Sequence, residues 1–242
     1  MHICGECSLR KSPGFLPLSE GELCFVSQAR TGAVKVRRGA DLFDQRVNQA
    51  QALTITKGWA QHYVTGPDGG ESICDFLLPG DWAYLDGFRV EAKRPTGVRA
   101  LTDLELCVHS YAELYRMFES QPGLVKMLVR TMALDRHRIE RRQAAVGRSV
   151  ASKRLGYLFL ELQDRSSQLR LGGANWFPLP VRRQHLENAL DLSRAQLSRA
   201  LSSLRAGGLA SFERGMVKIK DRPGLEHHSN YVPMRDCRRL LL

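Results

Sequence analysis

The sequence predicts an α+β protein in which a small antiparallel β-barrel or roll precedes a long helix and a C-terminal winged helix-turn-helix. Short runs of β-branched and aromatic residues alternate with turn residues between Gly32 and Ser110. After Pro122 the apolar residues recur every three or four positions, which is typical of a helix. Two short helical patterns and a hairpin pattern then fill residues 180–220. We therefore expect four parts: an irregular, cysteine-containing leader (1–31), a β domain (32–120), a long helix (121–147) and a winged helix-turn-helix domain (148–242).

Composition and charge narrow the class of protein. The 242 residues are 43% hydrophobic, enough for packed cores, and no apolar run is long enough to cross a bilayer. The N-terminus lacks the basic and apolar segments of a secretion signal, so we expect a cytoplasmic protein with no membrane partner. Thiols are reduced there, and the six cysteines are not expected to form a disulfide framework. The net charge of +11 favours a polyanionic partner, and the basic stretch that begins at Arg130 places its binding in the C-terminal part.

The β domain contains three clear strand patterns. They cover Leu53–Thr56, Trp59–Val64 and Ser72–Leu77. The segments Gly66–Gly70 and Leu78–Asp81 separate or follow them and carry the Gly, Pro and Asp residues of tight turns. Short strands at this spacing favour a closed antiparallel architecture.

The long helix is expected from Pro122 to about Val146, followed by a second amphipathic helix over Val150–Asp164. Its stripe consists of Leu124, Leu128, Thr131, Leu134, Arg138 and Arg142. A spacing near 3.5 on a helix of this length predicts a seam between two chains, and Ile139 should strengthen it. A helix buried in the core of one chain would show the same stripe.

The C-terminal pattern consists of two helices and a hairpin. The helices are expected over Val181–Leu190 and Arg194–Arg205, joined by the turn Asp191–Ser193, and Gly207 stops the second one. A hairpin over residues 209–219 follows. Two helices, a tight turn and a wing are the parts of a DNA-binding module, whereas a plain αα-hairpin is the alternative.

The second helix carries the strongest indication of function. Ser193 and Gln196 form a capping box, which fixes the first residue of the helix. Arg199 has the geometry to pair with guanine and Gln196 with adenine, while nearby basic and hydroxyl groups suit phosphates. We expect Leu186, Leu192, Leu197, Leu201 and Leu204 to pack inward. The candidate DNA contacts are Arg182, Arg183, Ser193, Arg194, Ala195, Gln196, Ser198, Arg199 and Ser202.

Over nearly its whole length the chain resembles the CRP/FNR family of bacterial transcription regulators. The resemblance rests on Leu78–Asp81, on Arg148–Leu162 and on Leu192–Arg199, in that order and spacing. It implies a double-stranded β-roll of the cyclic-nucleotide-binding type, a dimerisation helix, a palindromic DNA site, an effector held in the roll and RNA polymerase as a further partner. Ser198 and Arg199 match the Ser-Arg pair through which the family contacts DNA. Ala195 departs from it, because a glutamate that binds cytosine stands there in both well-known branches, whereas a methyl group could only touch thymine.

The resemblance also bears on the effector. The cyclic-nucleotide branch binds the ribose with a Gly-Glu pair and the phosphate with an Arg-Ser pair. In this chain no glutamate stands where the ribose hydroxyl needs an acceptor, although Asp86 is nearby, and a proline rather than a serine follows Arg94. No cAMP is therefore expected.

The oxygen-sensing branch holds a [4Fe–4S] cluster with three leader cysteines and one distant cysteine. Cys4 and Cys7 match the first two, Cys107 matches the distant one, and Pro13 stands at the third position. Cys24 is the first candidate for the missing ligand, with Cys74 or a carboxylate such as Asp75 as substitutes.

Other functions remain as alternatives at this point. The cysteines could act as a redox thiol switch or hold haem, and they could also be structural, with an unidentified effector or none. No nucleotide-binding loop, serine-hydrolase elbow, zinc-protease motif or catalytic triad is present in the sequence, so an enzyme is not expected.

Overall fold

The computed structural model describes residues 4–42, 51–84, 96–147 and 150–242. Asp86 and Arg94, two residues of the effector argument, lie outside these ranges. The chain forms two compact units, residues 1–133 with 238–242 and residues 134–237, which we call the first and second units. Within the described ranges, no helix is both long and apolar enough to span a membrane.

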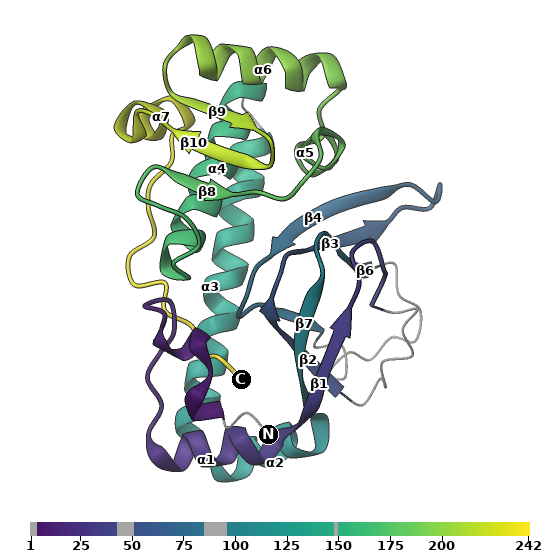
Figure 1. Ribbon diagram of the computed structural model, residues 1–242, viewed down its shortest axis with the longest axis vertical. Coiled ribbons are helices and arrows are strands. Elements are labelled where there is room, and N and C mark those ends of the chain that lie inside the picture. Colours follow the sequence, from purple (N-terminus) through teal and green to yellow (C-terminus); the bar gives the residue numbers. More distant parts are fainter. Residues whose placement is uncertain (1–3, 43–50, 85–95, 148–149) are drawn as a thin grey trace. The chain divides into compact units, whose positions relative to one another are not determined.

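The first unit is built on antiparallel sheets, shown in Figure 1. One sheet has the strand order β1-β7-β2-β5 and the other β4-β3-β6. The strands are β1 (Arg30–Val36), β2 (Gln51–Lys57), β3 (Ala60–Thr65), β4 (Glu71–Leu77), β5 (Trp82–Tyr84), β6 (Thr96–Ala100) and β7 (Leu104–Ser110). One core cluster contains apolar side chains from both sheets, for example Ile55 and Leu106 from one and Ala60 and Val98 from the other, so the sheets pack face to face. The predicted β-roll fold is confirmed.

The leader is not irregular, and that expectation was wrong. It forms the short helices η1 (Cys4–Glu6) and η2 (Ser8–Lys11) and the helix α1 (Glu20–Ala29). Ser19 begins α1 with a capping box: its backbone N–H donates to Glu22 Oε2 over 2.8 Å, and its side chain accepts from the Glu22 N–H. The Ser-x-x-Glu pattern of Ser19 and Glu22 is the sequence signal that marks the start of this helix.

Two helices follow the roll. They are α2 (Tyr111–Ser120) and α3 (Pro122–Gly147), and the predicted bounds of the long helix are confirmed. The boundary between the units falls within α3, after Ala133.

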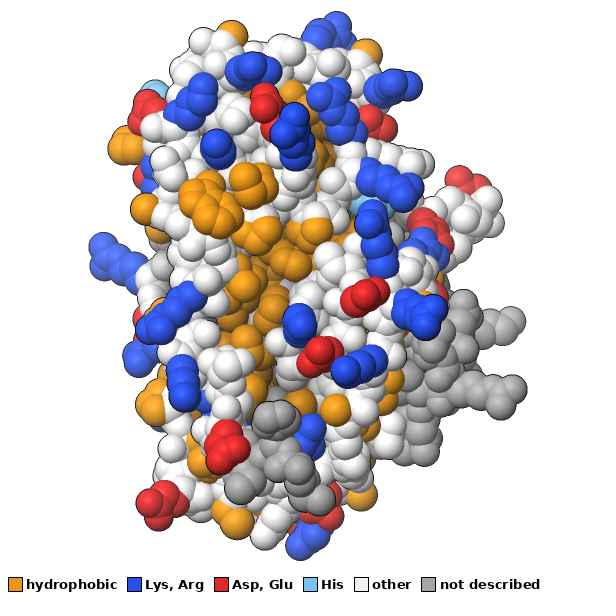
Figure 2. All heavy atoms as spheres, viewed as in Figure 1, with side chains coloured by type: hydrophobic (Ala, Val, Ile, Leu, Met, Phe, Trp, Pro, Cys, Tyr) orange, Lys and Arg blue, Asp and Glu red, His pale blue; other side chains and the backbone are white. Residues whose placement is uncertain are grey.

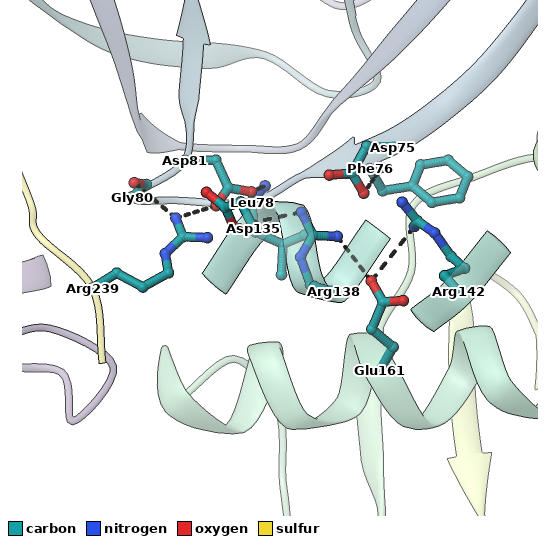
Figure 3. Close-up of polar contacts among 10 residues, drawn as sticks. All are labelled: Asp75, Phe76, Leu78, Gly80, Asp81, Asp135, Arg138, Arg142, Glu161 and Arg239. Atoms are coloured by element: carbon teal, nitrogen blue, oxygen red, sulfur yellow. Dashed lines mark hydrogen bonds and ion pairs between the residues drawn. The ribbon is translucent and has the colours of Figure 1, made fainter. Parts of the chain in front are cut away.

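The chain returns to the first unit after Cys237. The backbone of Arg239 bonds to the leader on both sides, because its N–H donates to Gly14 over 2.9 Å and its carbonyl accepts from Leu16 over 2.8 Å. Its guanidinium forms an ion pair with Asp81 and donates to the Gly80 carbonyl (Figure 3). Leu240 is fully buried in a cluster that also holds Cys4. We call Arg238–Leu242 the return segment.

The second unit contains helices and one small sheet, also labelled in Figure 1. Its sheet has the order β8-β10-β9. The remaining elements are α4 (Ala151–Gln168), β8 (Trp176–Pro178), α5 (Arg183–Leu190), α6 (Arg194–Ala206), β9 (Ala210–Glu213), β10 (Met216–Ile219) and α7 (Arg222–Ser229). The hairpin turn Arg214–Gly215 has positive φ at both residues, 51° and 72°, as a two-residue type I′ turn requires.

Candidate nucleic-acid interface and thiol site

The helix-turn-helix is held together by apolar side chains of α5, the turn and α6. Leu186, Leu192, Leu197 and Leu204 are buried as predicted, whereas Leu201 is only half-buried. Asp191 ends α5 in the left-handed conformation, with φ at 50°. Its N–H donates to the Asn188 carbonyl, so the turn is closed by the chain's own backbone.

Helix α6 begins at the predicted residue because both halves of its capping box form. The N–H of Ser193 donates to Gln196 Oε1 over 2.8 Å, and the N–H of Gln196 donates to Ser193 Oγ over 3.2 Å. The side-chain oxygen Oε1 of Gln196 already accepts from the Ser193 N–H. A bidentate contact between this side chain and adenine therefore requires the side chain to leave the cap.

The outward face of α6 is polar and exposed. Within the described part of the chain, no hydrogen bond or ion pair engages the side chain of Arg194 or of Arg199. All nine candidate DNA contacts are exposed: Arg182, Arg183, Ser193, Arg194, Ala195, Gln196, Ser198, Arg199 and Ser202. The arrangement thus offers two unneutralised guanidinium groups and several hydroxyls on one module.

The wing adds charges that the sequence interpretation did not single out. Arg214, Lys218 and Lys220 are exposed on the hairpin and just after it. Arg205 and Glu213 pair at 3.1 Å on the surface. Alternation along β10 would have identified Lys218, because Val217 and Ile219 are the buried residues on either side of it. Basic side chains are in fact spread over both units on the face shown in Figure 2.

Part of the basic stretch after Arg130 is structural. Arg138 and Arg142 are buried, and both bond to the buried Glu161 of α4, at 2.9 and 3.5 Å (Figure 3). Asp135 lies 3.6 Å from Arg138. These two arginines cannot serve a polyanion, because their charges are used inside the second unit.

The α3 stripe is likewise internal, so its assignment to a seam between two chains was wrong. Leu124, Leu128 and Thr131 are buried within the first unit, and the Thr131 hydroxyl accepts from the Leu240 N–H over 2.8 Å. Another face of α3 is exposed: Val129 and Met132 have exposed fractions of 59% and 56%. The pattern of burial could not be read from spacing alone, because both faces have apolar residues three and four positions apart.

Three of the predicted cysteine ligands occupy one environment in the first unit. Burial raises the pKa of the Cys107 thiol, and a hydrogen bond with Arg30 opposes this rise. The thiols of Cys4 and Cys7 lie near enough to raise the Cys107 pKa further. Burial lowers the pKa of Arg10, and the same three thiols act on it in the opposite direction. Arg10 Nε also donates to the Cys4 carbonyl over 3.0 Å, which ties η2 to η1.

The fourth predicted ligand does not share this environment. Cys24 lies on the exposed side of α1, with Gln28 Nε2 3.5 Å from its sulfur. Among residues 4–42, 51–84, 96–147 and 150–242, no three His, Cys, Asp or Glu side chains are close enough to hold a metal ion. The thiols are therefore gathered without being assembled into a finished site.

A buried histidine beside Cys107 was missed by the sequence interpretation. His109 has an exposed fraction of 1%, and neither ring nitrogen has a hydrogen-bond partner among the described residues. Burial, followed by the charges of Arg30 and Arg10, lowers its pKa to about 4, so the ring is neutral. Strand alternation would have placed His109 on the face of Cys107, two residues away.

Comparison with known proteins identifies both units. Residues 33–121 match the family described as cyclic nucleotide-binding domain, and residues 153–228 match the Crp-like helix-turn-helix domain. The transcriptional regulatory protein btr of Bordetella pertussis is 28% identical over 92% of this chain and 91% of its own. The nitrogen fixation regulation protein FixK of Bradyrhizobium diazoefficiens is 24% identical over 93% of each chain.

Solved structures show the same fold. FixK2 from Bradyrhizobium japonicum superposes with a TM-score of 0.68 at 22% identity, covering 84% of this chain and 98% of that one. A CRP-family transcriptional regulator from Thermus thermophilus gives 0.64 at 18% identity, over 82% and 97%. These relatives are regulators and not enzymes. The chain belongs to the CRP/FNR family of transcription regulators, with a DNA-binding helix-turn-helix in its second unit.

Proposed function

We propose that two copies of this chain bind a palindromic operator through α6 and contact RNA polymerase from it. The observation that carries the proposal is the exposed Arg199, whose guanidinium has no partner among the described residues, on a helix whose first turn is fixed by Ser193. Arg199 pairs with guanine, and Ser198, Arg194, Arg182 and Arg183 bond to phosphates. Ala195 contributes only a methyl contact, so the operator differs from sites that depend on a glutamate there. The chain acts in the cytoplasm, where such an operator lies.

The test is operator selection from a random duplex library, followed by binding titrations with variants. Arg199→Ala should weaken binding by about 1–3 kcal/mol and relax the preference at one base pair in each half-site. Arg235→Ala, an exposed arginine outside the helix-turn-helix and wing, is the matched control and should leave the preference unchanged. A uniform loss of affinity over all sequences would make Arg199 a phosphate contact instead. Binding should also weaken steeply with salt.

The dimer is proposed to form along the exposed face of α3. Val129, Met132 and Arg136 are exposed there and Ile139 is half-buried, and they follow one another at intervals of three, four and three residues, the spacing of a coiled-coil seam. Met132→Glu should shift the sedimentation of the protein towards a monomer, because it places a charge in the seam. His137→Glu adds a charge at another exposed position of α3 and should leave the dimer intact. A dimer that survives Met132→Glu would place the interface elsewhere.

The signal is proposed to reach the protein at Cys4, Cys7 and Cys107, through a thiolate-bound iron–sulfur cluster that responds to oxygen or redox state. The donor chemistry supports this, since thiolates are the usual ligands of such clusters and two guanidinium groups lie beside them. The alternative is a small-molecule effector in the cyclic-nucleotide-binding domain, or no cofactor; cAMP is not expected to bind. Anaerobic purification with iron and sulfide analysis decides between them. An iron-free, colourless protein contradicts the cluster.

A further inference from the structure

The second unit contains a cavity with a volume of about 560 Å³, lined by the last turns of α3, the start of α4 and the end of α7. This volume lies within the range of about 300–1,000 Å³ that is usual for small-molecule sites. Part of the lining is apolar and comes from two alanines of α3 and from Val150. The polar part consists of Arg141, Lys153, Tyr157, Ser229 and Asn230. Among the described residues, none that lines the cavity is acidic.

The two cations of the lining have no counter-ion in the described part of the chain. The guanidinium of Arg141 donates to the Val232 carbonyl, which is an uncharged acceptor. The Lys153 side chain is half-buried, and no described residue forms a hydrogen bond or ion pair with it. Two positive charges therefore face the same concave space without compensation.

The carboxylates of the neighbouring helices α4 and α7 are already engaged elsewhere. Glu161 bonds to the two buried arginines of α3, at 2.9 and 3.5 Å. Asp164 and Glu226 both form ion pairs with Arg222, at 2.7 and 2.8 Å. These groups do not neutralise the cavity, so its field attracts an anion from outside the chain.

Two hydroxyl groups complete the polar lining. The Tyr157 side chain is 5% exposed and packs edge to face on Tyr231, and its hydroxyl has no hydrogen-bond partner among the described residues. Burial raises the pKa of Tyr157 and the charge of Arg141 opposes this rise, so the phenol stays protonated and can donate. Ser229 is 4% exposed, and its Oγ also lacks a partner within the described ranges. Buried polar groups are normally hydrogen-bonded, and an oxyanion supplies the acceptor that Tyr157 lacks.

We propose that this cavity binds a small organic anion whose carboxylate or phosphate group pairs with Arg141 and Lys153 and accepts from the Tyr157 hydroxyl. The apolar part of the ligand contacts Val150 and the alanines of α3. A concave site of this size encloses a small molecule, whereas a duplex carries its phosphates on a convex backbone. The site lies entirely within the second unit, so it depends neither on the thiols nor on an effector in the cyclic-nucleotide-binding domain.

The test measures how phenyl phosphate, benzoate and the neutral benzyl alcohol bind to the full chain, by isothermal titration calorimetry without DNA. At least one of the anions should bind about tenfold more tightly than the alcohol, because charge-assisted hydrogen bonds are the stronger ones. Lys153→Gln should weaken its binding about tenfold and Tyr157→Phe about fivefold. Arg235→Gln removes an exposed cation of the same unit outside the cavity and is the matched control, with unchanged affinity. The anion that binds more tightly identifies the head group.

A second measurement locates the bound anion. In protein labelled with 3-fluorotyrosine, the fluorine signal that is absent from Tyr157→Phe belongs to Tyr157. This signal should shift when the anion is added and stay in place when benzyl alcohol is added. Neither Lys153→Gln nor Tyr157→Phe removes a side-chain hydrogen bond within the described residues, so the urea midpoints of both variants should equal that of the unaltered protein.

Several outcomes would overturn the proposal. Failure of both anions to bind, equal affinity for benzyl alcohol, or equal affinity in Lys153→Gln and the unaltered protein would each do so. If no anion binds but Lys153→Gln weakens binding to the operator, Lys153 contacts a DNA phosphate instead. Because the calorimetry contains no DNA, a negative result there leaves the proposed operator binding untouched.

Discussion

The helix α6 and the leader are held in place by different kinds of contact, local in α6 and distant along the chain in the leader. In α6, the residue that begins the helix, the residue that supports the cap and the glycine that follows the helix are all local. In the leader, Gly14 and Leu16 bond to Arg239, more than two hundred positions along the chain. Phe15 packs against Gly80 of the roll. A local element can be located from its sequence, whereas a segment held by distant partners needs the structure.

The largest expected effect comes from deleting the return segment, Arg238–Leu242. Its three leucines have exposed fractions of 0%, 2% and 7%, and burying a leucine is worth about 1.5–3 kcal/mol. The deletion should therefore destabilise the first unit by on the order of 5 kcal/mol in urea unfolding. Hydrogen exchange should accelerate at the Leu16 amide and stay unchanged in α6. A control is Val232→Ala, whose side chain is 63% exposed. Equal loss of protection in α6 would contradict the contrast between the two regions.

Most of the architecture followed from the sequence because its determinants are local. The strands β2, β3 and β4, the bounds of α3 and the hairpin of the wing were within a few residues of the prediction. The face of α3 that is buried was not predictable, since it depends on Leu240 and other distant residues. In the candidate sites the outward set on α6 was foreseen. His109 was missed because a lone histidine in a strand carries no pattern until its burial and its unpaired nitrogens are known.

The second effect concerns the contact of the leader with the roll. Gly80 has φ at +89°, and a Cβ there would lie 2.2 Å from the Phe15 ring. Gly80→Ala should cost about 1–2 kcal/mol for the backbone conformation and more for the clash. Gly39→Ala is the matched control, because φ is +84° and nothing lies within 4 Å of the added Cβ. Urea unfolding should show a larger loss at Gly80. In a protein that also carries Phe15→Ala, Gly80→Ala should lower the free energy of unfolding by an amount closer to that of Gly39→Ala. If Gly80→Ala costs the same with and without Phe15→Ala, the residues at positions 15 and 80 do not interact.

A smaller loss of stability is expected from removing the cap of α6. Ser193→Ala removes the hydroxyl that accepts from the Gln196 N–H and should cost about 1 kcal/mol. The loss should appear as faster hydrogen exchange in the first turn of α6, with the Leu16 amide unaffected. Ser202→Ala, an exposed position in the middle of the helix, is the control and should not reduce protection. Faster exchange at Leu16 would show that the leader depends on α6 and that the two regions are not separate.

The smallest effect on stability, and the most informative for recognition, is expected from Gln196→Glu. A glutamate keeps the acceptor that caps Ser193, and its charge suits the N-terminus of a helix, so stability should change by only a few tenths of a kcal/mol. It has no amide N–H to donate to a base, and its charge repels phosphates. If Gln196 leaves the cap to bind adenine, operator titrations should show lost preference at one base pair as well as weaker binding. If Gln196 only caps α6, affinity should fall equally for all sequences, since the contribution of the side chain is then entirely local.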